Sequence, residues 1–332
     1  MKKNHPSIRK LFVLFVMLIS AGFYGTAQES NKIVSDSVRI ETSNGIIFGI
    51  LFSPENLTGK VPAILCLQGG GDVGLSNYTF EPKFFARNGM VSLVCDKSGS
   101  GLSRTAKSWE EQTFVEKTAE YAELLDWLAK HPKTDTESIG VHGMSEGGRL
   151  ALNLAIEYPE KLAFVNSVSG PIASFKDNQL YAIYHHLHSQ NFDFPIIVEA
   201  LSVWNDYFDE IGKGKISQQT TDRVNILRLK APDLRYLPGN TTELPSRPLP
   251  QDIHFSTEEK VNQIKCPVLF QFGERDGRVD PLKSLSLIDQ KENFKIKNYK
   301  NADHNMTLEN GNIHPLFLQD KKEWLTKILK NL

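Results

Sequence analysis

The chain has 332 residues, and its 38 lysines and arginines nearly balance its 39 aspartates and glutamates, giving a formal net charge of −1. With no basic stripe or long charge run, neither nucleic acid nor an anionic membrane surface is an expected partner. Three cysteines, Cys66, Cys95 and Cys266, are too few for a disulfide scaffold. Free thiols are favoured because Cys66 and Cys95 lie in apolar, strand-like runs, although the sequence leaves a Cys66–Cys95 pair open.

The first 27 residues have the pattern of a secretory signal peptide. Four basic residues precede an apolar run over 11–21, and Gly25, Thr26 and Ala27 are small enough for signal-peptidase cleavage. The run is shorter than a membrane-spanning helix. We therefore expect a mature chain that begins near Gln28, in the periplasm or outside the cell, with no stable membrane insertion; a retained membrane anchor is the alternative.

The next elements predict an α/β fold. Residues 38–53 alternate around a turn at 43–45, as in a half-buried hairpin. Segments with helical periodicity cover 112–130, 146–158, 281–292 and, at the end of the chain, 316–332. The short apolar runs expected to form buried strands are Val61–Leu67, Met90–Cys95, Ile139–His142, Ala163–Val168, Val268–Phe272 and Phe294–Tyr299. This alternation favours a mostly parallel sheet covered by helices on both faces.

Residues 172–257 interrupt the alternation. They contain no clear buried strand, are rich in aromatic residues, and end in a proline-rich stretch. The aromatic content argues against disorder, and long insertions in compact domains are usually functional lids. The sequence therefore predicts a core in two parts, 28–171 and 258–332, separated by a mainly helical cap over 172–257.

The most informative motif is the Gly-X-Ser-X-Gly pattern of residues 143–147. A buried strand precedes it and a helix follows, so the pattern predicts a sharp turn that exposes the Ser145 hydroxyl at a helix N-terminus. The flanking glycines Gly143 and Gly147 remove the Cβ atoms that would clash in such a turn. Ser145 is therefore the candidate nucleophile.

A nucleophilic serine needs a base, and the base needs an orienting carboxylate. The apolar run 268–272 is followed by a polar turn that contains Asp276. This residue is therefore expected at the carboxyl end of a strand, where sites in open α/β sheets form. His304 lies in the loop after the next strand. Asp280 is the rival for the acid, whereas Asp303, beside the histidine, is expected to be a loop or capping residue.

With these residues in the order Ser, Asp, His, the chain resembles the α/β-hydrolases over nearly its whole mature length. The matching segments are 67–71, 96–103, 143–148, 273–276 and 302–304. The resemblance is greatest to the serine aminopeptidase-like lidded hydrolases and esterases. It implies an α/β-hydrolase fold with a mostly parallel eight-stranded sheet, a cap, and a catalytic triad of Ser145, Asp276 and His304.

The resemblance also implies an oxyanion hole formed by backbone N–H groups. One donor would be Glu146, and the other Gly70, with Gly69 as second choice. Two positions depart from the family pattern. Gln68 replaces a common histidine before the glycine loop, and Ser98 replaces a common arginine after Asp96-Lys97.

The expected activity is hydrolysis of a carboxylic ester through an acyl-enzyme, without cofactor or metal. Cleavage of short peptides, with cap acids such as Glu199, Asp206, Asp209 or Glu210 holding the substrate's amine, is the alternative. Thioester hydrolysis and non-catalytic binding are less favoured. The histidines His185, His186 and His188 lack the remaining ligands of a metal site, so we expect them on the cap surface or cleft lining.

Overall fold

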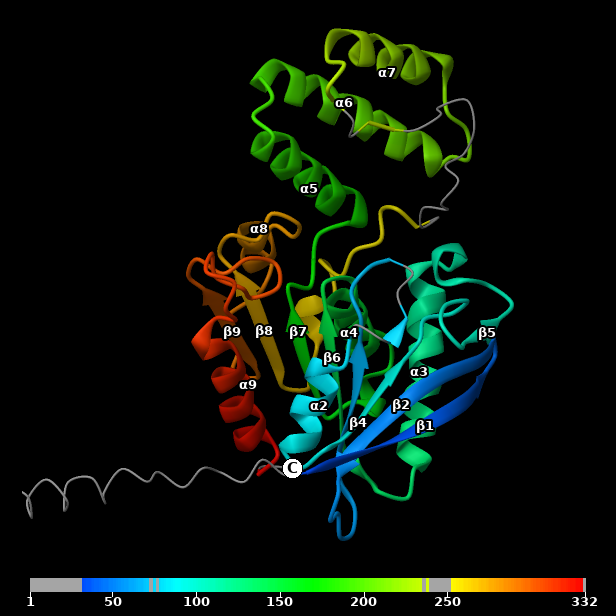
Figure 1. The fold of residues 1–332 in the computed structure, drawn as a ribbon, viewed down its shortest axis with the longest axis vertical. Coiled ribbons are helices and arrows are strands. Elements are labelled where there is room, and N and C mark those ends of the chain that lie inside the picture. The colour runs from blue at the N-terminus through cyan, green and yellow to red at the C-terminus, as the bar shows by residue number, and fades with distance from the viewer. Residues whose placement is uncertain (1–31, 72–73, 76–77, 235–236, 239–251, 331–332) are drawn as a thin grey trace, which may run out of the picture.

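The computed structural model describes residues 32–71, 74–75, 78–234, 237–238 and 252–330. The predicted signal peptide lies outside these residues. Within the described part, one sheet is covered by helices on both faces, and a group of helices forms a further layer beyond one end of the sheet (Figure 1). The predicted α/β fold class is confirmed.

The sheet begins with the predicted hairpin. β1 (Ile33–Thr42) and β2 (Gly45–Pro54) pair antiparallel, with Thr42 opposite Gly45. Gly45 has φ 137°, and a Cβ there would lie 2.4 Å from the Arg104 carbonyl oxygen. The turn therefore requires glycine at this position.

The remaining long strands are parallel to one another, and the last of them, β9, forms the other edge of the sheet. The strand order is β1-β2-β4-β3-β6-β7-β8-β9, and a ninth, two-residue strand, β5 (Arg104–Thr105), pairs with β2. The predicted eight strands are thus the eight of the main path. The bounds are β3 (Val61–Leu67), β4 (Val91–Cys95), β6 (Thr134–Met144), β7 (Phe164–Val168), β8 (Val268–Gly273) and β9 (Phe294–Tyr299).

Two hydrophobic clusters hold the helices to the two faces of the sheet. On one face pack α3 (Phe114–Lys130) and α4 (Glu146–Glu157), and on the other pack α2 (Phe80–Arg87) and α9 (Pro315–Ile328). Because both faces of the central strands are covered, their apolar runs are continuous rather than alternating.

One predicted helix is shorter than expected. α8 spans Pro281–Ser286 and does not continue to residue 292. The side chain of Asn262 donates to the Leu287 carbonyl at 2.9 Å and accepts from the Asp289 N–H at 2.9 Å. These bonds satisfy the backbone of the segment outside a helix, so the prediction for residues 287–292 is wrong.

The segment 172–257 contributes three helices and no strand among its described residues. They are α5 (Phe175–Ser189), α6 (Phe194–Ile211) and α7 (Gln218–Lys230), and Figure 1 shows them beyond the sheet. They share a hydrophobic core of their own, centred on Leu187, Val203 and Leu227. We refer to these three helices as the cap.

The three cysteines are free thiols. Burial raises the pKa of both Cys66 and Cys95. Among the described residues, no helix combines the length and hydropathy needed to cross a membrane.

Lys321 is a buried charge in α9. Its ammonium nitrogen has no hydrogen-bond partner in the described part of the chain and lies 4.3 Å from the centre of the Phe317 ring. Burial lowers the pKa of Lys321 to about 8. The unfolded chain, with an ordinary lysine pKa, therefore binds more protons than the folded chain between about pH 8 and 10.5, and stability from this group rises with pH across that window.

Lys321→Met should raise the free energy of unfolding at pH 7 by on the order of 2 kcal/mol, because it removes the cost of a buried, unpaired cation. Its advantage over the wild type should shrink at pH 9.5. Urea unfolding at both pH values measures this, with Lys327→Met on the exposed side of the same helix as control. A variant that is less stable than the wild type at pH 7 would contradict the prediction.

Candidate functional site

Ser145 lies in a turn that only glycine neighbours permit. It joins β6 to α4 with φ 56° and ψ −120°, in the left-handed region that side chains rarely adopt. A Cβ on Gly143 would lie 2.0 Å from the Gly147 carbonyl oxygen, and one on Gly147 would lie 2.4 Å from the Leu67 carbonyl oxygen. The Ser145 N–H donates to the Val168 carbonyl at 2.8 Å, which fixes the turn to β7.

The structure brings the predicted base and acid together. His304 Nδ1 lies 2.8 Å from Asp276 Oδ2. The other carboxylate oxygen of Asp276 accepts the backbone N–H groups of Arg278 at 2.8 Å and Val279 at 2.9 Å. The Asp276 side chain is fully buried. With both oxygens engaged, the carboxylate is held in one orientation towards the imidazole.

The other two acids have structural contacts. Asp280 is the N-cap of α8 and accepts the Lys283 N–H at 3.0 Å. Asp303 accepts the N–H groups of Asn305 at 2.9 Å and Thr307 at 2.8 Å, as the sequence predicted for a loop residue. Asp276 is therefore the acid that contacts His304.

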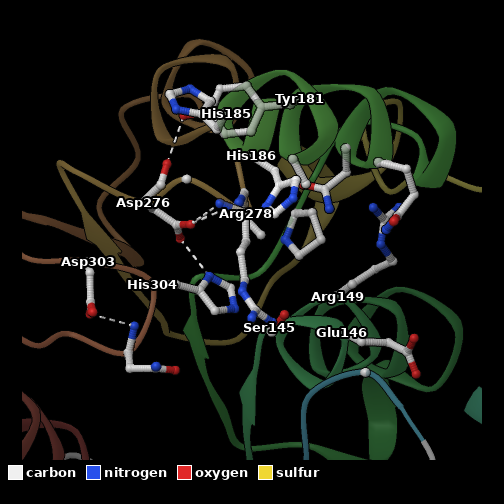
Figure 2. A pocket seen from close by; sticks show the side chains of 18 of the residues that line it. Ser145, Glu146, Arg149, Tyr181, His185, His186, Asp276, Arg278, Asp303 and His304 are labelled. Carbon is white, nitrogen blue, oxygen red and sulfur yellow. Dashed lines mark hydrogen bonds and ion pairs between the residues drawn. The ribbon is translucent and has the colours of Figure 1, made fainter. Parts of the chain in front are cut away.

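Ser145 and His304 line one cavity of about 1080 Å³ between the sheet and the cap (Figure 2). No hydrogen bond joins the Ser145 hydroxyl to His304 among the described residues. In hydrolases such bonds often form only when substrate is bound. The two groups therefore share a substrate-sized space in which this contact can form.

The glycine loop, residues 69–71, follows β3 and faces Ser145. A Cβ on Gly69 would lie 3.4 Å from Ser145 Cβ, and Gly70 lines the cavity. The buried Lys97 ammonium donates to the carbonyls of Gly69 and, at 2.7 Å, Gly71. With these carbonyls turned towards Lys97, the loop is braced from the side away from the cavity.

Glu146, the second expected donor, is fixed through its side chain. Its carboxylate accepts the Trp109 indole N–H at 2.8 Å and lies 3.4 Å from the Lys117 ammonium and 4.0 Å from that of Lys97. Burial alone would raise the pKa of Glu146, but the two lysines and the indole lower it below its usual value. Lys97 thus holds the backbone of the glycine loop and also lies near the side chain of Glu146, the other expected donor.

The two departures from the family pattern have local partners. Gln68 is buried and donates to the Cys95 carbonyl at 2.9 Å, which joins the glycine loop to the end of β4. Ser98 donates to the Glu120 carboxylate at 2.6 Å. Both side chains are structural in this fold.

The cap reaches the site through α5. The Tyr181 hydroxyl donates to the backbone carbonyl of Asp276 at 2.8 Å, and the His185 ring lies 4.3 Å from the Tyr181 ring (Figure 2). Burial lowers the pKa of His185. His185 and His186 line the cavity. In the described part of the chain no group of three or more His, Cys, Asp or Glu side chains could hold a metal ion.

Several residues of the site were not found from the sequence. Lys97 belongs to a motif segment, but the motif says nothing about its contacts. Arg149 is a basic residue in an otherwise apolar stretch of α4, which was an available signal; it is 1 % exposed and lines the cavity. Arg278, two residues after the acid, and Tyr181 have no sequence signal that separates them from surface residues.

The sequence matches the family model of the BAAT / acyl-CoA thioester hydrolase C-terminal region over residues 119–226. This segment contains Ser145 but neither Asp276 nor His304. No curated protein matches the sequence at a significant level.

Solved structures share the fold over nearly the whole chain. A hypothetical protein from Pseudomonas aeruginosa is 16% identical, with a TM-score of 0.59, covering 90% of this chain and 94% of its own. The α/β hydrolase GrgF from Penicillium sp. sh18 is 15% identical, with a TM-score of 0.57 and coverage of 90% and 98%. Est1E from Butyrivibrio proteoclasticus, solved with ferulic acid bound, is 15% identical, with a TM-score of 0.56 and coverage of 89% and 98%. At these identities the likeness is one of fold.

The turn at Ser145 should not accept a side chain on its first glycine. Gly143→Ala should lower the free energy of unfolding by about 3 kcal/mol or more, because its Cβ would overlap backbone atoms that cannot move independently. Gly70→Ala is the matched control for stability, since the nearest atom to its Cβ would be a Glu146 carboxylate oxygen at 3.5 Å, an ordinary van der Waals contact. Urea unfolding compares the two, and equal stability would contradict the role assigned to this glycine.

Proposed function

We propose that this chain, which shares its fold with solved α/β-hydrolases, is a serine hydrolase that cleaves carboxylic esters through an acyl-enzyme. The observation that carries the proposal is the contact between Asp276 and His304 beside the strained turn of Ser145. The sequence's predicted export signal lies outside the described residues, so action in the periplasm or outside the cell is part of the proposal.

The proposed reaction starts with proton transfer from Ser145 to His304. The Ser145 oxygen attacks the carbonyl carbon while His304 Nε2 accepts its proton, and Asp276 accepts a hydrogen bond from the Nδ1–H of the resulting imidazolium. The C–O bond to the leaving alcohol then breaks, and His304 returns the proton to that oxygen. Water then attacks the acyl-enzyme carbonyl while His304 accepts its proton; the C–O bond to Ser145 breaks, and His304 returns the proton to the Ser145 oxygen as the acid leaves.

Negative charge develops on the carbonyl oxygen in both steps. The backbone N–H groups of Glu146 and Gly70 are the proposed donors, with Gly69 as the alternative to Gly70. Gly70 is preferred because it lines the cavity. Loss of one such donor typically slows hydrolysis by about 10² to 10³.

The contacts of the cap acids weigh against the peptidase alternative. Asp206 pairs with Arg223, Asp209 with Lys176 at 2.6 Å, and Glu199 with Lys230 at 3.2 Å. Glu210 accepts hydrogen bonds from Ser217 at 2.7 Å. These acids are used within the cap and its connections, and none of them lines the cavity that contains Ser145. A substrate's free amine therefore finds no unused cap carboxylate there.

A thioester substrate is the second candidate, supported by the family match over residues 119–226. The same acylation chemistry would release a thiol in place of an alcohol. Hydrolysis of an oxoester and a thioester with the same acyl group separates the two candidates.

Ser145→Ala should abolish hydrolysis of p-nitrophenyl acyl esters and labelling by a fluorophosphonate probe, because the nucleophilic oxygen is absent. Mass spectrometry of the wild type should place the probe on Ser145. The same treatment of the Ser167→Ala variant, in which a buried serine of β7 is changed, should still give labelling. Labelling of Ser145→Ala at the wild-type rate would overturn the assignment.

Lys97→Met should lower kcat by about tenfold or more with a smaller change in KM, because the glycine loop loses the cation that holds two of its carbonyls. Lys117→Met is a matched control: its ammonium lies at the same 4.6 Å from the Trp109 ring and also contacts Glu146.

The two lysine variants are compared at equal folded fraction, measured by circular dichroism. Lys117→Met should lower kcat less than Lys97→Met does. Equal losses of kcat in the two variants would contradict the role of the loop contacts. They would show that kcat depends on the contacts that both lysines make with Glu146.

A further inference from the structure

The cavity beside Ser145 contains negative side chains that already have partners. Asp276 and Asp303 are engaged as described above, and Glu274 accepts the Asn301 N–H at 3.0 Å. The Glu146 carboxylate faces Trp109 and the two buried lysines. These acids are therefore committed to the protein itself.

Arg149 is a buried cation with unused hydrogen-bonding capacity. One guanidinium nitrogen donates to the Phe255 carbonyl at 2.8 Å, while the other terminal nitrogen, Nη2, has no partner in the described part of the chain. No carboxylate of the described residues lies within ion-pair distance. Burial lowers the pKa of Arg149 to about 10, so the side chain stays charged at neutral pH. A buried donor without an acceptor is costly, which makes this position unusual.

Arg278 is the second cation of the cavity. Its backbone N–H holds Asp276, but its exposed guanidinium makes no hydrogen bond or ion pair with the residues that the structure describes. Figure 2 shows this side chain extending from the loop of Asp276 towards Ser145. Its neighbour Arg275, by contrast, pairs with Glu309.

The position of Arg149 sets where an anionic group would lie. Its backbone N–H donates to the Ser145 carbonyl at 3.1 Å, so it follows the nucleophile by four residues, about 6 Å along the helix. A group bound there is separated from the reacting carbonyl by a short chain of a few atoms.

We propose that this site takes substrates that carry a second, anionic group a few atoms from the scissile carbonyl, held by the guanidinium groups of Arg149 and Arg278. Guanidinium forms paired, charge-assisted hydrogen bonds with carboxylate and related oxyanions. The substrate class is thus an anionic ester, of which a half-ester of a short dicarboxylic acid is the simplest. This inference rests on the proposed hydrolase function and adds its substrate class.

The test compares three aryl esters as substrates of the wild-type protein. Mono-p-nitrophenyl glutarate carries the anion on the acyl side, p-nitrophenyl valerate is its neutral counterpart, and the butyrate ester of 4-hydroxybenzoate carries the anion on the leaving group. The glutarate ester should have a kcat/KM at least about tenfold above that of the valerate ester. A preference for the 4-hydroxybenzoate ester would place the anion on the leaving-group side instead.

Arg278→Gln should reduce the glutarate-to-valerate ratio of kcat/KM by about tenfold or more, and Arg278→Lys should restore part of it. Arg149→Lys, which keeps the charge in the buried position, should reduce the ratio without unfolding the protein. Arg275→Gln is the matched control, because this variant removes a guanidinium that is paired with Glu309. The glutarate-to-valerate ratio of kcat/KM in Arg275→Gln should equal that of the wild type.

A measurement of binding separates failure of this inference from failure of the hydrolase proposal. In Ser145→Ala, glutarate should raise the melting temperature more than neutral glutaramide does, and Arg278→Gln in the same background should remove the difference. Hydrolysis of valerate with no anionic preference, and no change in ratio in either arginine variant, would overturn the inference and leave the hydrolase proposal standing. Absence of all hydrolysis and probe labelling would overturn the hydrolase proposal, and the melting temperatures would then decide the anion site alone.

Discussion

The left-handed backbone of Ser145 is the constraint on which the rest of the site depends. It turns the chain from the end of β6 directly into α4, and the absent side chains of Gly143 and Gly147 make the turn possible. The same turn brings Glu146 to the cavity and places Arg149 about one helical turn beyond. A single strained residue thus fixes the candidate nucleophile, an expected oxyanion donor and a buried cation relative to one another.

Buried charges then hold the loops around this turn. Lys97 and Lys117 lie on the Trp109 ring, and both approach the Glu146 carboxylate. The two cations exceed the one anion by one positive charge, and the carbonyls of the glycine loop accept hydrogen bonds from the Lys97 ammonium. Since an uncompensated buried charge is costly, the loop carbonyls cannot turn away without a penalty.

Much of the fold was readable from the sequence because central parallel strands are apolar on both faces. Ser145, Asp276 and His304 could be named because each follows the end of a strand, where sites of this architecture form. The role proposed for Arg149 and Arg278 could not be read in this way, because it depends on which hydrogen-bond acceptors the folded chain brings near them; among the described residues, Nη2 of Arg149 has none. The end of α8 was likewise set by Asn262, which lies 25 residues before Leu287 in the sequence and so gives no local signal for that helix.

The cap is attached to the core at points that belong to the site. Tyr181 of α5 holds the carbonyl of Asp276, Arg149 holds the Phe255 carbonyl on the segment that returns from the cap, and Asp252 on that segment accepts the Phe114 N–H at 2.7 Å. A displacement of α5 would therefore pull on the residue that orients His304, and a displacement of the returning segment would pull on a proposed substrate-binding arginine. In this protein the placement of the cap and the geometry of the proposed reaction rest on the same few hydrogen bonds, so substrate selection and catalysis are not separable into cap and core.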